Sequence, residues 1–168
     1  MKNLLAIALC FSCLGIHAQR QTFTDPDLTF GFTKPPTWKV KDDLVVKVIP
    51  KDETFENAIT FFSITYFEEP EGDEATQALF SKAVMSPSIP AGLNGYELGK
   101  SGKTTIADKE ALWSSFTHIQ NGEKAKVISY VFKKYNQRFE ILISAPLKSF
   151  AEDSALLNDL VSSIFVEE

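Results

Sequence analysis

The sequence predicts an α+β domain in which one antiparallel β-sheet is covered by helices on both faces, an α/β/α sandwich. Runs with apolar residues at every second position fill most of the chain, which is the pattern of strands. Several runs carry apolar residues on both faces, which indicates packing on each side of the sheet. Short turn signals join the runs of the second half, so these strands are expected to be antiparallel neighbours.

The first residues predict a secretory signal peptide over 1–18. Lys2 precedes an apolar run over 4–16, and Ile16-His17-Ala18 forms a small-residue site suited to cleavage before Gln19. The run is too short for a stable transmembrane helix, and no later stretch is long enough to span a membrane. We therefore expect an exported protein, periplasmic or extracellular after cleavage near Ala18.

Both cysteines, Cys10 and Cys13, lie inside this predicted signal peptide. The residues before each cysteine fit a lipidation motif poorly, although lipidation stays open as an alternative. The mature chain would then have no thiol, so its stability must come from a hydrophobic core and not from disulfides.

The remainder predicts a flexible, polar lead-in over 19–27 and a single domain over 28–168. Of the 168 residues, 150 remain after residue 18, which is a single-domain length. The formal net charge of −5 argues against nucleic acid and against an anionic membrane surface as partners, because binding to either depends on neutralising negative charge.

The first half is dominated by strand patterns. Residues 28–33 alternate apolar and polar, and Pro35-Pro36 ends this strand because proline has no backbone donor. A second strand begins at Trp38. Residues 44–49 are apolar apart from Lys47, which suits a strand buried on both faces. Residues 58–67 carry aromatic side chains on both faces, which favours an interior strand.

An acidic loop over 68–74 leads to a predicted helix over 73–85, where Asp73 and Glu74 suit the positive helix end. Residues 86–95 contain two prolines and two glycines, so this segment is expected to be a loop. Predicted strands follow over 96–106, 111–119, 127–135 and 139–145.

Turn signals at residues 107–110, Asn121-Gly122 and Asn136-Gln137 connect these strands, and Asn-Gly is the strongest hairpin signal in the chain. A closing helix begins with a predicted capping box, Ser149 and Glu152. Its apolar stripe contains Leu156, Leu157, Leu160, Val161, Ile164 and Phe165.

The sequence predicts no catalytic, cofactor-binding or metal residue, and we expect the protein not to be an enzyme. The acidic loop lacks the alternating spacing of a calcium loop and is interpreted as solvated. His118 is the single histidine of the mature chain, and one histidine cannot supply the several ligands of a zinc site. The sequence also has no Gly-x-Ser-x-Gly elbow that would pair a serine with it. A carboxylate pair assembled only by folding would leave no sequence signal and stays open.

The loop over 86–95 is the candidate site for a partner contact. It places Ile89 and Leu93 on a segment rich in proline and glycine, where burial of apolar side chains is difficult. The alternative is a loop folded down as a lid on the sheet edge.

Two patches resemble the PsbP-like family, which includes PsbP and DcrB-like exported bacterial proteins. The first is residues 28–32 (Leu-Thr-Phe-Gly-Phe) followed by Pro36-x-Trp38-x-Val40, and the second is the end of the closing helix, Leu160-x-x-Ser163-Ile164-Phe165. The order of strands over residues 25–168 is similar to theirs. The resemblance implies an α/β/α sandwich and a role in binding or assembly, not catalysis. No site residue of the family matches here, and Trp38 is expected to fill the core.

The sequence thus predicts an exported, non-enzymatic binding or accessory module of the cell envelope. An alternative is a periplasmic carrier of an apolar small molecule or lipid, in which the phenylalanines would line a cavity. The expected partner is accordingly a protein or a small apolar ligand, with no cofactor.

Overall fold

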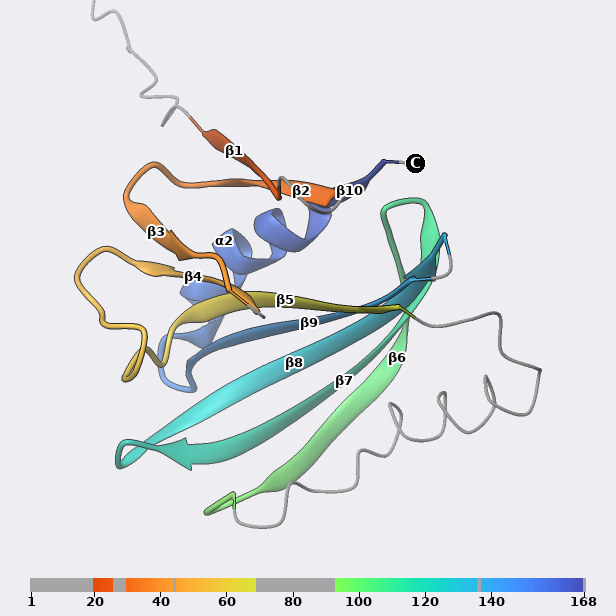
Figure 1. Cartoon of the computed structure of the whole chain (residues 1–168). Helices are drawn as coiled ribbons and strands as arrows, with labels where there is room; N and C mark the ends of the chain where they lie inside the picture. Colours follow the sequence, from red (N-terminus) through yellow and green to blue (C-terminus); the bar gives the residue numbers. More distant parts are fainter. Residues whose placement is uncertain (1–19, 26–29, 44, 69–92, 136, 168) are drawn as a thin grey trace, which may run out of the picture.

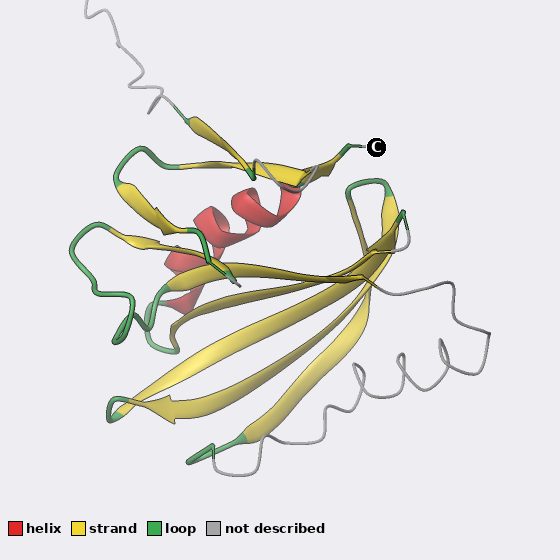
Figure 2. Ribbon diagram, viewed as in Figure 1, coloured by secondary structure: helices red, strands yellow, loops and turns green. Residues whose placement is uncertain are grey.

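The computed structural model describes residues 20–25, 30–43, 45–68, 93–135 and 137–167. These form ten strands and one helix in two sheets (Figures 1 and 2). The elements in chain order are β1 Gln21–Thr24, β2 Phe30–Lys34, β3 Trp38–Lys41, β4 Val46–Pro50, β5 Phe61–Glu68, β6 Glu97–Ile106, β7 Lys109–Gln120, β8 Glu123–Lys134, β9 Gln137–Pro146, α2 Phe150–Ser162 and β10 Phe165–Val166.

The larger sheet has seven strands in the order β3-β4-β5-β9-β8-β7-β6, and each neighbouring pair is antiparallel. A smaller sheet has the order β1-β2-β10, so strands near the two chain ends meet on β2. The α+β class with antiparallel strands is therefore confirmed.

One face of the larger sheet carries the core. Strand β2 packs on this face through Phe32, whose ring centroid lies 4.9 Å from that of Phe62, and through Phe30, which lies 6.0 Å from Phe139. Helix α2 covers the same face beside the small sheet, burying Phe150, Leu157, Leu160 and Val161 (Figure 1). Among the described residues the helical cover is on one face, and the predicted helix over 73–85 lies outside them. An α/β/α sandwich is not confirmed.

The turn between β7 and β8 has the backbone conformation that its two residues predict. Asn121 and Gly122 both have positive φ, 52° and 80°, as a two-residue type I′ turn requires. The last hairpin differs from its prediction by one residue, because Lys134 pairs with Gln137 and the turn has positive φ at Tyr135. Gln137 thus belongs to β9 and not to the turn.

Two short strands and the start of the helix also differ from the sequence predictions. Residues 21–24, predicted as flexible lead-in, form β1 against β2. Phe165, predicted at the end of the closing helix, lies in β10. The predicted capping box is wrong, since the Ser149 hydroxyl donates to the carboxylate of Asp153 at 2.7 Å and makes no cap bond to the backbone.

Trp38 lies in the core as predicted, with 9% of its surface exposed. It begins β3, and its neighbour Val40 packs against the same core cluster. Because side chains alternate along a strand, Lys39 and Lys41 project from the opposite face of the sheet. The same alternation on β4 buries Val46 and Val48 and turns Lys47 to that opposite face.

Candidate functional site

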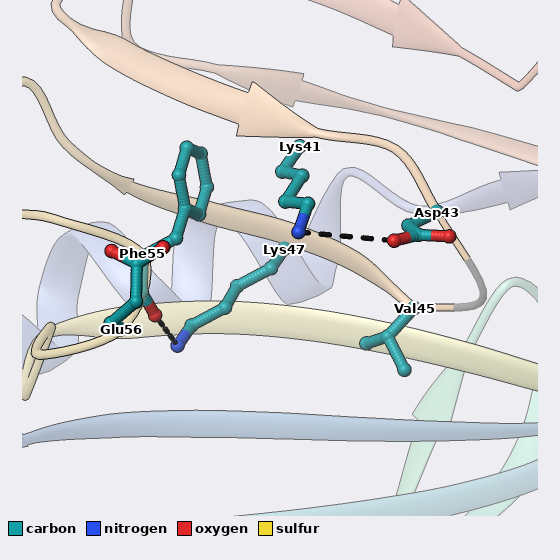
Figure 3. Close-up of a pocket in the computed structure, with 6 residues that line it drawn as sticks. All are labelled: Lys41, Asp43, Val45, Lys47, Phe55 and Glu56. Carbon is teal, nitrogen blue, oxygen red and sulfur yellow. Dashed lines mark hydrogen bonds and ion pairs between the residues drawn. The ribbon is translucent and has the colours of Figure 1, made fainter.

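Two lysines lie on the face of the larger sheet opposite α2. The register of β3 and β4 places Lys41 directly across from Lys47, and Lys47 in turn faces Ser63 of β5. An open groove with a volume of about 320 Å³ lies over them, and it is lined by Lys41, Asp43, Val45, Lys47, Phe55 and Glu56 (Figure 3).

The Lys47 ammonium is held in place by the protein. It donates a hydrogen bond to the backbone carbonyl of Phe55 at 2.9 Å, and it lies over the Phe61 ring, 4.6 Å from the centroid. Burial lowers the pKa of Lys47 below its ordinary value of 10.5, while the carboxylates of Glu53 and Glu56 act against this shift. The charge of Lys47 is thus incompletely solvated.

Lys41 is less constrained. Its ammonium lies 3.8 Å from a carboxylate oxygen of Asp43, and both side chains are more than half exposed, at 57% and 65% (Figure 3). An exposed ion pair of this length contributes little to stability, so it can rearrange around a bound group.

The loop over residues 51–60, which connects β4 to β5, forms the apolar wall through Phe55. Its shape is fixed by local bonds, including Ala58 N–H to the Thr54 carbonyl at 2.8 Å and Ile59 N–H to the Glu53 carboxylate at 2.9 Å. The Gln120 amide donates to the Ala58 carbonyl at 3.0 Å and ties the loop to the β7–β8 hairpin. The Phe55 carbonyl that accepts from Lys47 is therefore part of an anchored loop.

The arrangement can hold a charged group beside an apolar one. It offers two ammonium groups, two carboxylates and the apolar surfaces of Val45 and Phe55. Among the described residues, no group of three or more histidine, cysteine, aspartate or glutamate side chains is placed to hold a metal ion. His118 is buried in β7, and its ring centroid lies 5.9 Å from that of Phe116.

No model of a known protein family matches the sequence, and no curated protein matches it closely. Solved structures do match the fold. PsbP (CyanoP) of Synechocystis sp. PCC 6803 superimposes with a TM-score of 0.62 at 17% identity, over 93% of this chain and 98% of that one. The chain has the PsbP-like fold. The two resembling patches seen in the sequence are thus consistent with the three-dimensional arrangement.

Two further structures share this fold. LpqN, which is involved in cell envelope biogenesis of Mycobacterium tuberculosis, superimposes with a TM-score of 0.57 at 13% identity, over 89% of this chain and 92% of that one. A protein of Bacteroides thetaiotaomicron gives a TM-score of 0.63 at 14% identity, with 89% of this chain matching 49% of that one. The PsbP-like fold therefore includes a protein involved in cell envelope biogenesis.

Of the two residues predicted for a partner contact, Leu93 does not line the groove. Ile89 lies outside the described residues. Leu93 is half-buried, and the chain beyond it is held to β7 by a hydrogen bond of 2.7 Å from the Ile119 N–H to the Asn94 carbonyl. A partner contact at Leu93 stays a prediction.

Sequence reasoning missed the groove residues Lys41, Val45, Lys47 and Phe55. The available signal was Lys47 itself, the one charged residue in the apolar run over 44–49. Its match with Lys41 depends on strand register, and the position of the Phe55 carbonyl depends on loop conformation, neither of which the sequence pattern reveals.

Proposed function

We propose that the chain is an exported, non-enzymatic binding or accessory module of the cell envelope. The observation that carries the binding role is the open groove, where an anchored ammonium lies beside an apolar wall on the surface of the sheet. Such a site is suited to holding a partner. The likeness to LpqN supports the envelope, and the N-terminal sequence pattern supports export.

The carrier alternative has less support from the described core. Its phenylalanines pack on one another: Phe132 and Phe139 stack with ring centroids 4.9 Å apart, and Phe30, Phe32 and Phe62 are fully buried. Rings in mutual contact close a core and do not line a cavity. In the described part of the chain, no helix has the length and apolar character needed to cross a membrane.

Export is tested by expressing the full chain and measuring the intact mass in each cell fraction. We expect the mass of a chain that begins at Gln19, in the periplasmic or extracellular fraction. The full-length mass in the cytoplasmic fraction would contradict export.

The non-enzymatic role is tested with chromogenic ester, phosphate and glycoside substrates. We expect no turnover by the purified chain. Turnover that disappears in a His118→Ala variant of unchanged stability would contradict this role.

A further inference from the structure

We infer that the groove at Lys41 and Lys47 receives an acidic segment of a protein partner, in which a carboxylate lies next to an apolar side chain. This inference rests on the proposed binding role and names the chemistry of the partner. The positions that carry it are Lys41, Val45, Lys47, Phe55 and Phe61.

The register places several lysine side chains on one face of the sheet. Lys41 and Lys47 are a direct cross-strand pair, and like charges in such a pair destabilise a sheet. Lys39 lies on the same face two residues before Lys41, with its ammonium 5.8 Å from the Phe55 ring centroid. A carboxylate that enters the groove beside Lys47 is attracted by these positive side chains.

The Lys47 ammonium is oriented before any partner arrives. An ammonium has three N–H donors. Within the described residues, one donates to the Phe55 carbonyl, and the ring of Phe61 lies beneath the group. A donor remains for an incoming carboxylate oxygen, and the partial burial of Lys47 strengthens that interaction because water competes less for the charge.

The rest of the lining selects a single carboxylate over a polyanion. Asp43 and Glu56 balance the two lysines of the groove, and the whole chain carries a net charge of −5. A nucleic acid or an anionic bilayer would bring many negative charges against these acids. One acidic side chain can instead lie between the lysines while a neighbouring apolar side chain covers Val45, which is 40% exposed, and Phe55.

The open shape favours a side chain of a protein over a free small molecule. Small ligands are held in sites that bury most of their surface, and this groove leaves one side open to solvent. A protein partner supplies the missing contacts around the groove from its own surface.

The edge of the sheet at β3 also favours a partner that binds through its side chains over one that adds a strand to the sheet. This strand is an edge of the seven-stranded sheet, and Lys34 donates from its ammonium to the Trp38 carbonyl at 2.8 Å. A lysine at an edge carbonyl hinders the addition of a partner strand.

The test is a titration of the full mature chain, followed by the amide and lysine side-chain NMR signals. The probe is the capped peptide Gly-Leu-Glu-Leu-Gly, and the matched control peptide has Gln in place of Glu. We expect the acidic peptide to shift the signals of Val45, Lys47 and Phe55 and to bind about tenfold more tightly than the Gln peptide, as loss of one charge-assisted hydrogen bond implies.

Lys47→Met keeps a long stem over Phe61 and removes the charge, so we expect it to reduce affinity for the acidic peptide about tenfold. Lys41→Gln should weaken binding in the same direction, and its exposed position avoids a folding defect. Lys103→Gln is the matched control, because Lys103 is exposed on β6 at the other edge of the sheet. Equal binding of the two peptides, or equal loss in the control, would overturn the inference.

Hexanoate serves as the probe for a free carboxylate. If it binds as tightly as the acidic peptide with the same shifts, the source is a small molecule and the inference is wrong. A photo-crosslinking residue at Val45 or at Leu98, which lie near opposite edges of the seven-stranded sheet, separates the two proposals in envelope preparations. Adducts at Leu98 alone would overturn the groove and leave the binding role, whereas adducts at neither position would overturn both.

Discussion

Trp38 is the residue at which the first strands join the core. Its ring is 9% exposed and belongs to the cluster that contains Phe32, Phe62 and Leu160. We expect Trp38→Ala to lower the free energy of unfolding by about 3–5 kcal/mol, because the cavity is only partly refilled. Urea unfolding measures this. Val45→Ala, at a position 40% exposed, is the control and should change stability by about 0.5 kcal/mol or less; a similarly small loss for Trp38→Ala would show that the ring does not support the core.

The partial burial of Lys47 makes its contribution to the free energy of unfolding depend on pH. Since its pKa is lowered in the folded state by burial, the unfolded chain holds more protons on this side chain at pH values between the folded pKa and 10.5. Stability from this group therefore rises with pH through that window. We expect the native chain to gain stability relative to Lys47→Met as the pH is raised from neutral toward 10.5, measured by urea unfolding.

The matched comparison for this pH effect is Lys103→Met, which removes an exposed lysine from β6. Tyr130, whose pKa is raised by burial, is common to all three proteins, so its contribution cancels in the differences. A stability difference for Lys47→Met that does not change with pH, or one that changes equally for Lys103→Met, would contradict the burial of the ammonium.

At the level of elements, the start of α2 is held by a bond between two side chains and not by the capping box predicted from the sequence. The Ser149 hydroxyl donates to the Asp153 carboxylate at 2.7 Å, and no side-chain bond caps the backbone. We expect Ser149→Ala to cost about 1 kcal/mol or less, and Glu152→Ala to have almost no effect, by urea unfolding. Equal losses for the two substitutions would indicate that the capping box forms after all.

The hairpins show what the sequence can and cannot specify about elements. Asn121-Gly122 was predicted correctly because few residues adopt positive φ at both turn positions. Tyr135 has positive φ without being glycine or asparagine, so nothing in its type indicated the turn. The short strands β1 and β10 have too few apolar residues for a period to be visible, and they exist because β2 pairs with both.

The groove could not be predicted in the same way. A strand over 44–49 was predicted from its apolar run and expected to be buried on both faces, whereas Val45 and Lys47 line an open groove. The pairing of Lys41 with Lys47 is a property of the register of two strands. The Phe55 carbonyl is a backbone group placed by a loop whose bonds reach Gln120 and Asn121 on a distant hairpin. Contacts of this range are set by the assembled sheet and leave no local pattern.

Across the whole molecule, the small sheet joins segments from the two ends of the described chain. Gly31 pairs with Thr24 on one side and with Phe165 on the other. A Cβ at this position would overlap the Phe165 ring and lie 2.5 Å from the Phe23 carbonyl oxygen. Only glycine therefore lets β1 and β10 approach β2 together.

Gly31→Ala is accordingly expected to loosen both segments at once. One of the two contacts is backbone, which cannot move aside like a flexible side chain, so the added methyl must shift β1, the Phe165 ring or both. Amide hydrogen exchange should show reduced protection in β1 and in β10 together, while protection in β8 and β9 is retained. Thr22→Ala in β1, an exposed position, is the matched control and should leave the protection of β10 unchanged. If Gly31→Ala leaves protection intact in both short strands, or reduces it in β1 alone, then the three strands do not depend on one close approach at Gly31.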